Sequence, residues 1–202
     1  PVYIDAEEME SEKRASTILK DVDGVLVPGG FGERGTEGKI NAIKYARENN
    51  LPFFGICLGM QLAIIEFARN VCEIKDATSS EFEVPGTAVI DYIEGQSKDV
   101  AKGGSMRLGA YSCELMPKTL AKDIYGEKLI SERHRHRLEV NNDFISSYEQ
   151  NGLTISGKNP ASFRVVLWKY ISILPAKSDP NSSKFVSGSL YKIKQLTLKP
   201  AS

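Results

Sequence analysis

Histidine is scarce in this chain, which has only His134 and His136 among 202 residues. Tryptophan occurs once, and cysteine occurs three times, at Cys57, Cys72 and Cys113. An odd number of cysteines with no C-x-x-C pair argues against a disulfide framework and against a zinc site. The same pattern indicates a reducing compartment, so a cytoplasmic protein is expected.

Net charge is also missing, because 26 basic and 26 acidic side chains cancel. A neutral chain has no global field that would attract nucleic acid or a membrane surface, so neither partner is expected. The sequence contains no signal peptide and no run of about 18 apolar residues. With 41% hydrophobic and 26% charged residues, the composition is that of one soluble globular domain.

The first part of the chain alternates between short apolar runs and longer amphipathic segments. Strands are predicted at residues 23–28 and 51–56, and each is followed by a glycine-containing turn. Helices are predicted after the turns, at residues 36–49 and 58–71. This alternation is typical of a parallel sheet with crossover helices, whose ligands bind at the carboxyl ends of the strands.

The predicted fold class is therefore α/β, a mostly parallel open sheet with helices on both faces and a small antiparallel region. We expect that antiparallel region around residues 85–115, where the pattern changes to short strands and loops. Residues 2–5 are predicted to form a further short strand.

Cys57 stands between two glycines in the sharp turn after the second apolar run. The spacing Gly55-x-Cys57-x-Gly59 matches the G-x-S-x-G elbow that presents the serine nucleophile of hydrolases. Such an elbow needs glycine, because the nucleophile is strained and the strand and helix approach closely. A sulfur at a helix N-terminus is also favoured as a thiolate. The spacing alone leaves two interpretations open, a nucleophile or a small buried apolar side chain.

The first glycine turn, PGGFG at residues 28–32, also has two interpretations. It is either an ordinary tight turn between strand and helix or an oxyanion hole. In the second case, backbone amides beside Cys57 point at a developing negative charge, which bulky side chains would obstruct.

Longer strings around these residues resemble one family. GICLGMQ at residues 55–61 is similar to the nucleophile motif of class I (triad-type) glutamine amidotransferases. SSEF at residues 79–82 and RHRHRLEVN at residues 133–141 are similar to STEF and RHRHRYEVN in the glutaminase domain of CTP synthase. GGSMRLG at residues 103–109 is similar to GGTMRLG of the same domain. With the PGGFG turn, the motifs occur in the family's order, and the resemblance covers about residues 1–158.

The resemblance implies the fold of a class I glutamine amidotransferase and a role for each matching residue. Cys57 would be the nucleophile, and the amides of Gly30 and Leu58 would form the oxyanion hole. Glu81 would pair with the α-ammonium of the glutamine substrate, and Arg137 would bind its α-carboxylate. The implied substrate-binding set is Gly30, Leu58, Gly59, Met60, Gln61, Glu81 and Arg137.

The resemblance also implies the reaction and its partners. L-glutamine would be hydrolysed through a cysteine thioester, with no cofactor or metal for this step. The ammonia would pass to an amidoligase domain, which uses ATP and magnesium to aminate UTP to CTP. The full enzyme is expected to be an oligomer.

The sequence departs from the family pattern in its last part. A thiol nucleophile of this type needs a histidine base oriented by a carboxylate, which the family supplies in a late Q-x-H-P-E motif. Beyond Gly157 the chain has neither histidine nor glutamate. Three explanations are open: a tail from another reading frame, a natural pseudo-glutaminase, or His134 or His136 acting as a substitute base.

Charge marks the same boundary. Residues 160–202 contain seven basic residues and one acidic residue, whereas the preceding part has a net charge of −6. The expected organisation is therefore an amidotransferase domain over residues 1–158 and an atypical basic tail over residues 159–202. The family's first strand and helix precede residues 2–5, so we expect the domain to lack them. A catalytically impaired glutamine-binding module is the alternative function.

Overall fold

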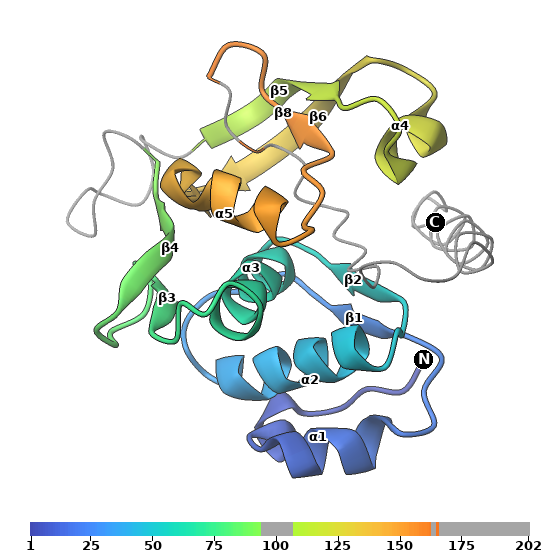
Figure 1. The fold of residues 1–202 in the computed structure, drawn as a ribbon, viewed down its shortest axis with the longest axis vertical. Coiled ribbons are helices and arrows are strands. Elements are labelled where there is room, and N and C mark those ends of the chain that lie inside the picture. Colours follow the sequence, from blue (N-terminus) through green and yellow to red (C-terminus); the bar gives the residue numbers. More distant parts are fainter. Residues whose placement is uncertain (94–106, 163–164, 166–202) are drawn as a thin grey trace.

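The computed structural model describes residues 1–93, 107–162 and 165, with Arg107 described by its backbone alone. Helices and strands alternate from α1 to α3, and strands predominate after α3 (Figure 1). In chain order they are η1 (Ala6–Met9), α1 (Glu12–Leu19), β1 (Val25–Val27), α2 (Thr36–Glu48), β2 (Phe53–Gly55), α3 (Leu58–Asn70), β3 (Ala77–Ser79), β4 (Thr87–Tyr92), β5 (Arg107–Leu115), α4 (Leu120–Tyr125), β6 (Leu129–His136), β7 (Leu138–Val140), η2 (Asn142–Phe144), α5 (Ile145–Gln150) and β8 (Gly157–Lys158).

The fold is α/β with parallel strands and helices, as the sequence predicts. Strands β1 and β2 pair in parallel, and α2 connects them as a crossover helix. Strands β3 and β4 are also parallel, and β7 joins β4 in the antiparallel direction. Helix α3 lies between these two groups of strands, while α1 packs on the outer side of α2 (Figure 1).

The antiparallel region is larger than the sequence predicts. Strand β5 pairs with β6 along most of its length and with β8 near its end. Strand β4, which was expected to belong to this region, pairs in the antiparallel direction with β7 on one edge and in parallel with β3 on the other. The basic run at residues 133–141 forms the end of β6 together with β7. Residues 103–106 of the GGSMRLG string and residues 163–164 and 166–202 of the basic tail lie outside the described residues.

The strand expected at residues 2–5 is absent from the structure, so this prediction was wrong. Val2 and Tyr3 are 82% and 93% exposed. A strand is stabilised by hydrogen bonds to a neighbouring strand and by burial of one face. Residues 2–4 have apolar or aromatic side chains, but residues 2–5 belong to none of the described sheets.

Helix α3 forms the centre of the hydrophobic core. Every residue from Leu58 to Ala68 is buried, which explains why most side chains of this stretch are apolar. Its side chains pack against β1, β2, β4 and β7 in one cluster. In the part of the chain that the structure describes, no helix is long and apolar enough to cross a membrane.

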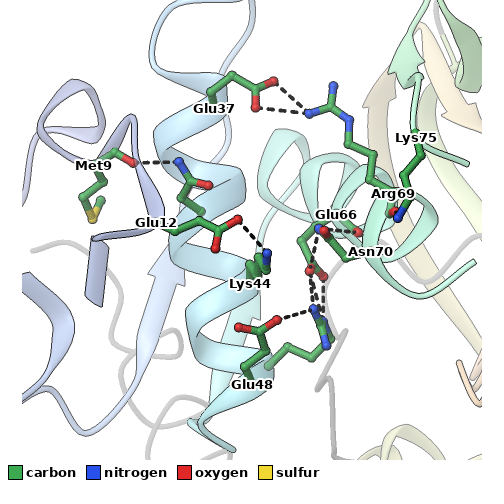
Figure 2. Close-up of polar contacts among 11 residues, drawn as sticks. Met9, Glu12, Glu37, Lys44, Glu48, Glu66, Arg69, Asn70 and Lys75 are labelled. Carbon is green, nitrogen blue, oxygen red and sulfur yellow. Dashed lines mark hydrogen bonds and ion pairs between the residues drawn. The ribbon is translucent and has the colours of Figure 1, made fainter. Parts of the chain in front are cut away.

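One charged group is buried on this apolar helix. The side chain of Glu66 is 0% exposed and accepts hydrogen bonds from Arg47 of α2, at 2.8 Å from Nη2 and 3.0 Å from Nε. The amide of Asn70 donates to the same carboxylate at 3.2 Å. Figure 2 shows this cluster where α2 crosses α3. Burial of a carboxylate is tolerated here because its oxygens are paired.

Removing the arginine from this cluster should destabilise the fold. We expect Arg47→Ala to lower the free energy of unfolding by about 2 kcal/mol, because it leaves the charge of Glu66 buried without its main partner. This loss should be smaller than the roughly 3–5 kcal/mol that breaking a fully buried ion pair costs, since the Arg47 side chain is itself 18% exposed.

Urea unfolding followed by circular dichroism measures this loss. Lys44→Ala is the matched control, because Lys44 bridges from the same helix to Glu12, whose side chain is 68% exposed (Figure 2). A surface pair of this kind contributes at most about 1 kcal/mol. Equal losses in the two variants would show that the buried pair has no special role.

Candidate active site

The site is organised around Cys57, which forms a strained turn between β2 and α3. Its backbone angles are φ 53° and ψ −108°, in a region that residues with a Cβ rarely adopt. Helix α3 begins at the next residue, so the thiol stands at the helix N-terminus. Strain of this kind persists where the surrounding packing enforces it, and it is frequent at active sites.

The flanking glycines are required by close backbone contacts. A Cβ on Gly59 would lie 2.2 Å from the carbonyl oxygen of Val27 in β1. A Cβ on Gly55 would lie 2.7 Å from the carbonyl carbon and oxygen of Gly59. The first turn of α3 therefore rests directly on the backbone of the two strands, and this contact holds the elbow in place.

The PGGFG turn lies against the elbow. A Cβ on Gly29 would meet the Cβ of Cys57 at 3.4 Å, which is an ordinary contact distance. The backbone amides of Leu58 and Gly30 lie close enough to the Cys57 sulfur to lower the pKa of its thiol. These are the two amides that the sequence predicts for an oxyanion hole, and the structure brings both to the thiol.

Electrostatics at Cys57 combine opposing effects. Burial raises the pKa of the thiol, and it outweighs the two amides, which lower that pKa. The negative charge of Glu81 raises the pKa further. At neutral pH the resting sulfur is therefore a thiol, and attack on a substrate requires that its proton be removed.

Glu81 enters the site from the loop that follows β3. Its Oε1 accepts a hydrogen bond from the amide of Gly32 at 3.2 Å, so this loop is tied to the PGGFG turn. The structure thus places the predicted carboxylate next to the predicted nucleophile. Met60 and Gln61 follow in the first turn of α3, where they are 1% and 5% exposed.

Arg137 lies between β6 and β7, beside the carboxyl end of β4. Its carbonyl oxygen accepts a hydrogen bond from the amide of Ile93 at 3.0 Å. Gly30, Cys57 and Glu81 likewise follow the carboxyl ends of β1, β2 and β3. Gly30 and Cys57 therefore follow strands of the β1-β2 sheet, whereas Glu81 and Arg137 lie at the carboxyl ends of β3 and β4 in the β3-β4-β7 sheet. Ligands of α/β sheets bind at the carboxyl ends of the strands, which is where each of these residues is found.

Two contacts at this edge were missed by sequence reasoning. The ring of Tyr92 lies under the guanidinium of Arg137, with 5.5 Å between Cζ and the ring centroid. The hydroxyl of Ser80 donates to Asp91 Oδ1 at 2.6 Å. From the sequence, Tyr92 and Asp91 are predicted only to belong to a strand, because the neighbouring residues do not indicate which distant side chains they contact.

Both histidines lie in β6, which belongs to a different sheet from the elbow strands. Their Nδ1 atoms are 3.4 Å apart, and His134 is 3% exposed. His134 also makes an edge contact with the ring of Tyr111, at 5.6 Å between centroids. Among the described residues, the charged side chain that shifts the pKa of Cys57 is Glu81.

The described residues offer no metal site, and their best-formed cavity lies away from Cys57. Residues 1–93, 107–162 and 165 contain no cluster of three or more His, Cys, Asp or Glu side chains that could hold a metal ion. A cavity of about 780 Å³ lies between the first residues of the chain and β1. None of the residues predicted to bind substrate lines this cavity, so it is separate from the Cys57 site.

The raised pKa of Cys57 predicts how its reactivity depends on pH. Because the thiolate is the reactive form, alkylation by iodoacetamide should accelerate as the pH rises. The pH at which the rate is half its maximum should lie above about 8.5, the ordinary pKa of a thiol. Glu81→Gln removes a nearby negative charge, which should lower the pKa and shift the profile to lower pH.

Mass spectrometry of the Cys57 peptide gives both profiles. Glu83→Gln is the control, because Glu83 is an exposed carboxylate two residues further along the same loop. A profile that stays in place in Glu81→Gln, or that shifts equally in both variants, would refute the electrostatic contact.

Comparisons with known proteins give a consistent result. The family model "Glutamine amidotransferase class-I" matches residues 2–166. The CTP synthase of Ruminiclostridium cellulolyticum is 53% identical over 159 residues, which are 79% of this chain and 30% of that protein. The CTP synthase of Methanocaldococcus jannaschii is 55% identical over 164 residues, with 78% and 30% covered. This chain therefore spans less than a third of the length of these relatives.

Solved structures point the same way. The glutaminase domain of Trypanosoma brucei CTPS, with bound acivicin, matches with a TM-score of 0.73 and 39% identity, covering 81% of this chain and 63% of that one. A GMP synthase-like protein from Thermoplasma acidophilum matches with a TM-score of 0.51 and 16% identity, covering 91% and 82%, and indicates the fold alone. The resemblance inferred from the sequence motifs is confirmed.

Proposed function

The chain belongs to the class I glutamine amidotransferase family, and we propose that it hydrolyses L-glutamine as the glutaminase part of a CTP synthase. The observation that carries this proposal is the geometry of Cys57. A thiol held at a positive φ, at a helix N-terminus and against two backbone amides is built for nucleophilic attack on a carbonyl.

The proposed reaction begins with attack of the Cys57 sulfur on the side-chain amide carbon of glutamine. The S–C bond forms, and the amides of Gly30 and Leu58 stabilise the oxyanion. The C–N bond then breaks, and ammonia leaves with the proton that came from the thiol. Water cleaves the resulting thioester, which releases glutamate and restores the thiol.

The two charged side chains at the same edge suit the two ends of the amino acid. Glu81 would pair with the α-ammonium group, and Arg137 would bind the α-carboxylate through its guanidinium fork. Gly59, Met60 and Gln61, in the first turn of α3, would contact the substrate between Cys57 and these charges.

We assign the later steps to the longer protein of which such a glutaminase is a part. There the ammonia would pass to an amidoligase domain, which would use ATP and magnesium to convert UTP to CTP. Glutamine hydrolysis itself would need neither. The three free thiols suit the reducing cytoplasm, and the full enzyme is proposed to be an oligomer.

A second candidate function is a glutamine-binding module that does not turn over. The observation in its favour is the position of both histidines in β6, outside the elements that form the elbow. Without a base, Cys57 would stay mostly protonated and thioester formation would be slow.

Ammonia release from L-glutamine separates the two candidates. The glutaminase predicts release with L-glutamine and none with D-glutamine, whose α-substituents cannot reach both charged side chains. The binding module predicts no release in a sample whose Cys57 is still labelled by acivicin. Absence of both reactions in folded protein would contradict both candidates.

A further inference from the structure

The guanidinium of Arg137 is supported by an aromatic ring. Its Cζ lies 5.5 Å from the centroid of Tyr92, and both side chains are half-buried. The backbones are also joined, because Tyr92 is opposite Leu138 in the β4–β7 ladder and the amide of Ile93 donates to Arg137. Ring and guanidinium are therefore held together by the sheet as well as by their own attraction.

The same end of β4 is connected to the loop that carries Glu81. The amide of Ser80 donates to the carbonyl of Ile90 at 2.9 Å, and its hydroxyl donates to Asp91 Oδ1 at 2.6 Å. Asp91 Oδ1 also accepts from the amide of Tyr92 at 2.7 Å. The end of β4 thus contacts both Arg137 and the residue that precedes Glu81.

We propose that Tyr92 is a positioning residue for substrate recognition, which orients Arg137 toward the α-carboxylate of glutamine. This inference rests on the proposed function. An arginine side chain is flexible, and fixing it in one orientation costs conformational entropy at the moment of binding. A ring beneath the guanidinium reduces that cost, while the planar N–H fork can still make a bidentate contact with a carboxylate.

The proposal predicts which ligands respond to a change at Tyr92. Ligands with the carboxylate, L-glutamine and glutaramate, should lose affinity when the ring is removed. γ-Aminobutyramide, which keeps the amino group and the amide but lacks the carboxylate, should bind unchanged. Tyr92→Leu should weaken the first two ligands about fivefold to tenfold, the range of an attraction between a cation and a ring. Tyr92→Phe keeps the ring and should retain affinity.

The experiment measures how each ligand protects Cys57 of the folded chain from iodoacetamide. The rate without ligand is the internal control, since equal rates in all variants show that the elbow is intact. Loss of protection confined to Tyr92→Leu and to the two carboxylate ligands supports the proposal. Three results would overturn it. Tyr92→Leu could show the same protection as the unaltered protein, or it could lose protection equally with all three ligands. Tyr92→Phe could also lose as much protection as Tyr92→Leu.

Failure of the proposed function gives a different result in this experiment. If L-glutamine gives the unaltered protein no protection, then the chain has no glutamine site at Cys57, and the role of Tyr92 is overturned with it. If L-glutamine protects the unaltered protein and Tyr92→Leu equally well, then the glutamine site stands and only the positioning role fails.

Discussion

Replacing Cys57 with alanine is expected to abolish ammonia release from L-glutamine, with a fall of at least about 10⁴-fold. Among the described residues, Cys57 is the thiol that combines an N-terminal helix position with two nearby backbone amides that lower its pKa. Without its sulfur no thioester can form, and the remaining groups only bind the substrate. The rate of ammonia release, measured with a coupled dehydrogenase, gives the comparison.

Cys72→Ala is the matched control for this experiment. Cys72 is a half-buried thiol 3.9 Å from the carbonyl oxygen of Ser147, and burial raises its pKa. Cys113 is fully buried, and burial raises its pKa to about 11, so it should be unreactive at neutral pH. Cys72→Ala should therefore keep full activity. Residual release in Cys57→Ala that exceeds the blank would mean that another group is the nucleophile.

Replacing Gly59 with alanine is expected to cost about 3 kcal/mol or more of unfolding free energy, at or beyond the upper end of overpacking effects. In most helices the same change stabilises by about 0.5–1 kcal/mol. Here the new Cβ would lie 2.2 Å from the carbonyl oxygen of Val27 and 2.9 Å from its carbonyl carbon. Because both atoms belong to the backbone of β1, α3 and the strand must move apart. The contact thus decides the sign of the effect.

Urea unfolding tests this expectation, and Gly29→Ala is its control. At Gly29 the added Cβ would meet the Cβ of Cys57 at 3.4 Å, an ordinary contact. The midpoint for Gly59→Ala should fall by roughly 1 M or more, given a typical slope of about 1–3 kcal/mol per M. Gly29→Ala should shift it little. A Gly59→Ala protein as stable as the original would contradict the close approach of α3 to β1.

The elbow and the alternation of strands and helices could be predicted because they are local. All the features that predict the elbow lie close together in the sequence: the apolar run before Cys57, the glycines on either side of it and the apolar helix after it. Together they predict a tight turn with a cysteine at its apex, although the spacing alone does not decide whether that cysteine is a nucleophile. Residues 36–48 and 58–70 form the predicted helices to within one residue at their ends.

Features that depend on distant residues could not be read in the same way. Strand β3 has only three residues, all buried, and it exists because β4 pairs with it. Residues 2–5 begin with three apolar or aromatic side chains and resemble a strand, but a strand needs a partner, and none of the described sheets includes these residues. The contact of Tyr92 with Arg137 joins residues 45 positions apart, so no local pattern indicates it.

The central claim is that Cys57 is the nucleophile of a formed glutamine site. The most direct measurement is the residue that acivicin modifies, identified by peptide mass spectrometry, and the effect of L-glutamine on its rate. We predict one label per chain, on Cys57, slowed by excess L-glutamine and unaffected by D-glutamine. Labelling shared between Cys57 and Cys72 without protection by L-glutamine, or no labelling of folded protein, would contradict the claim.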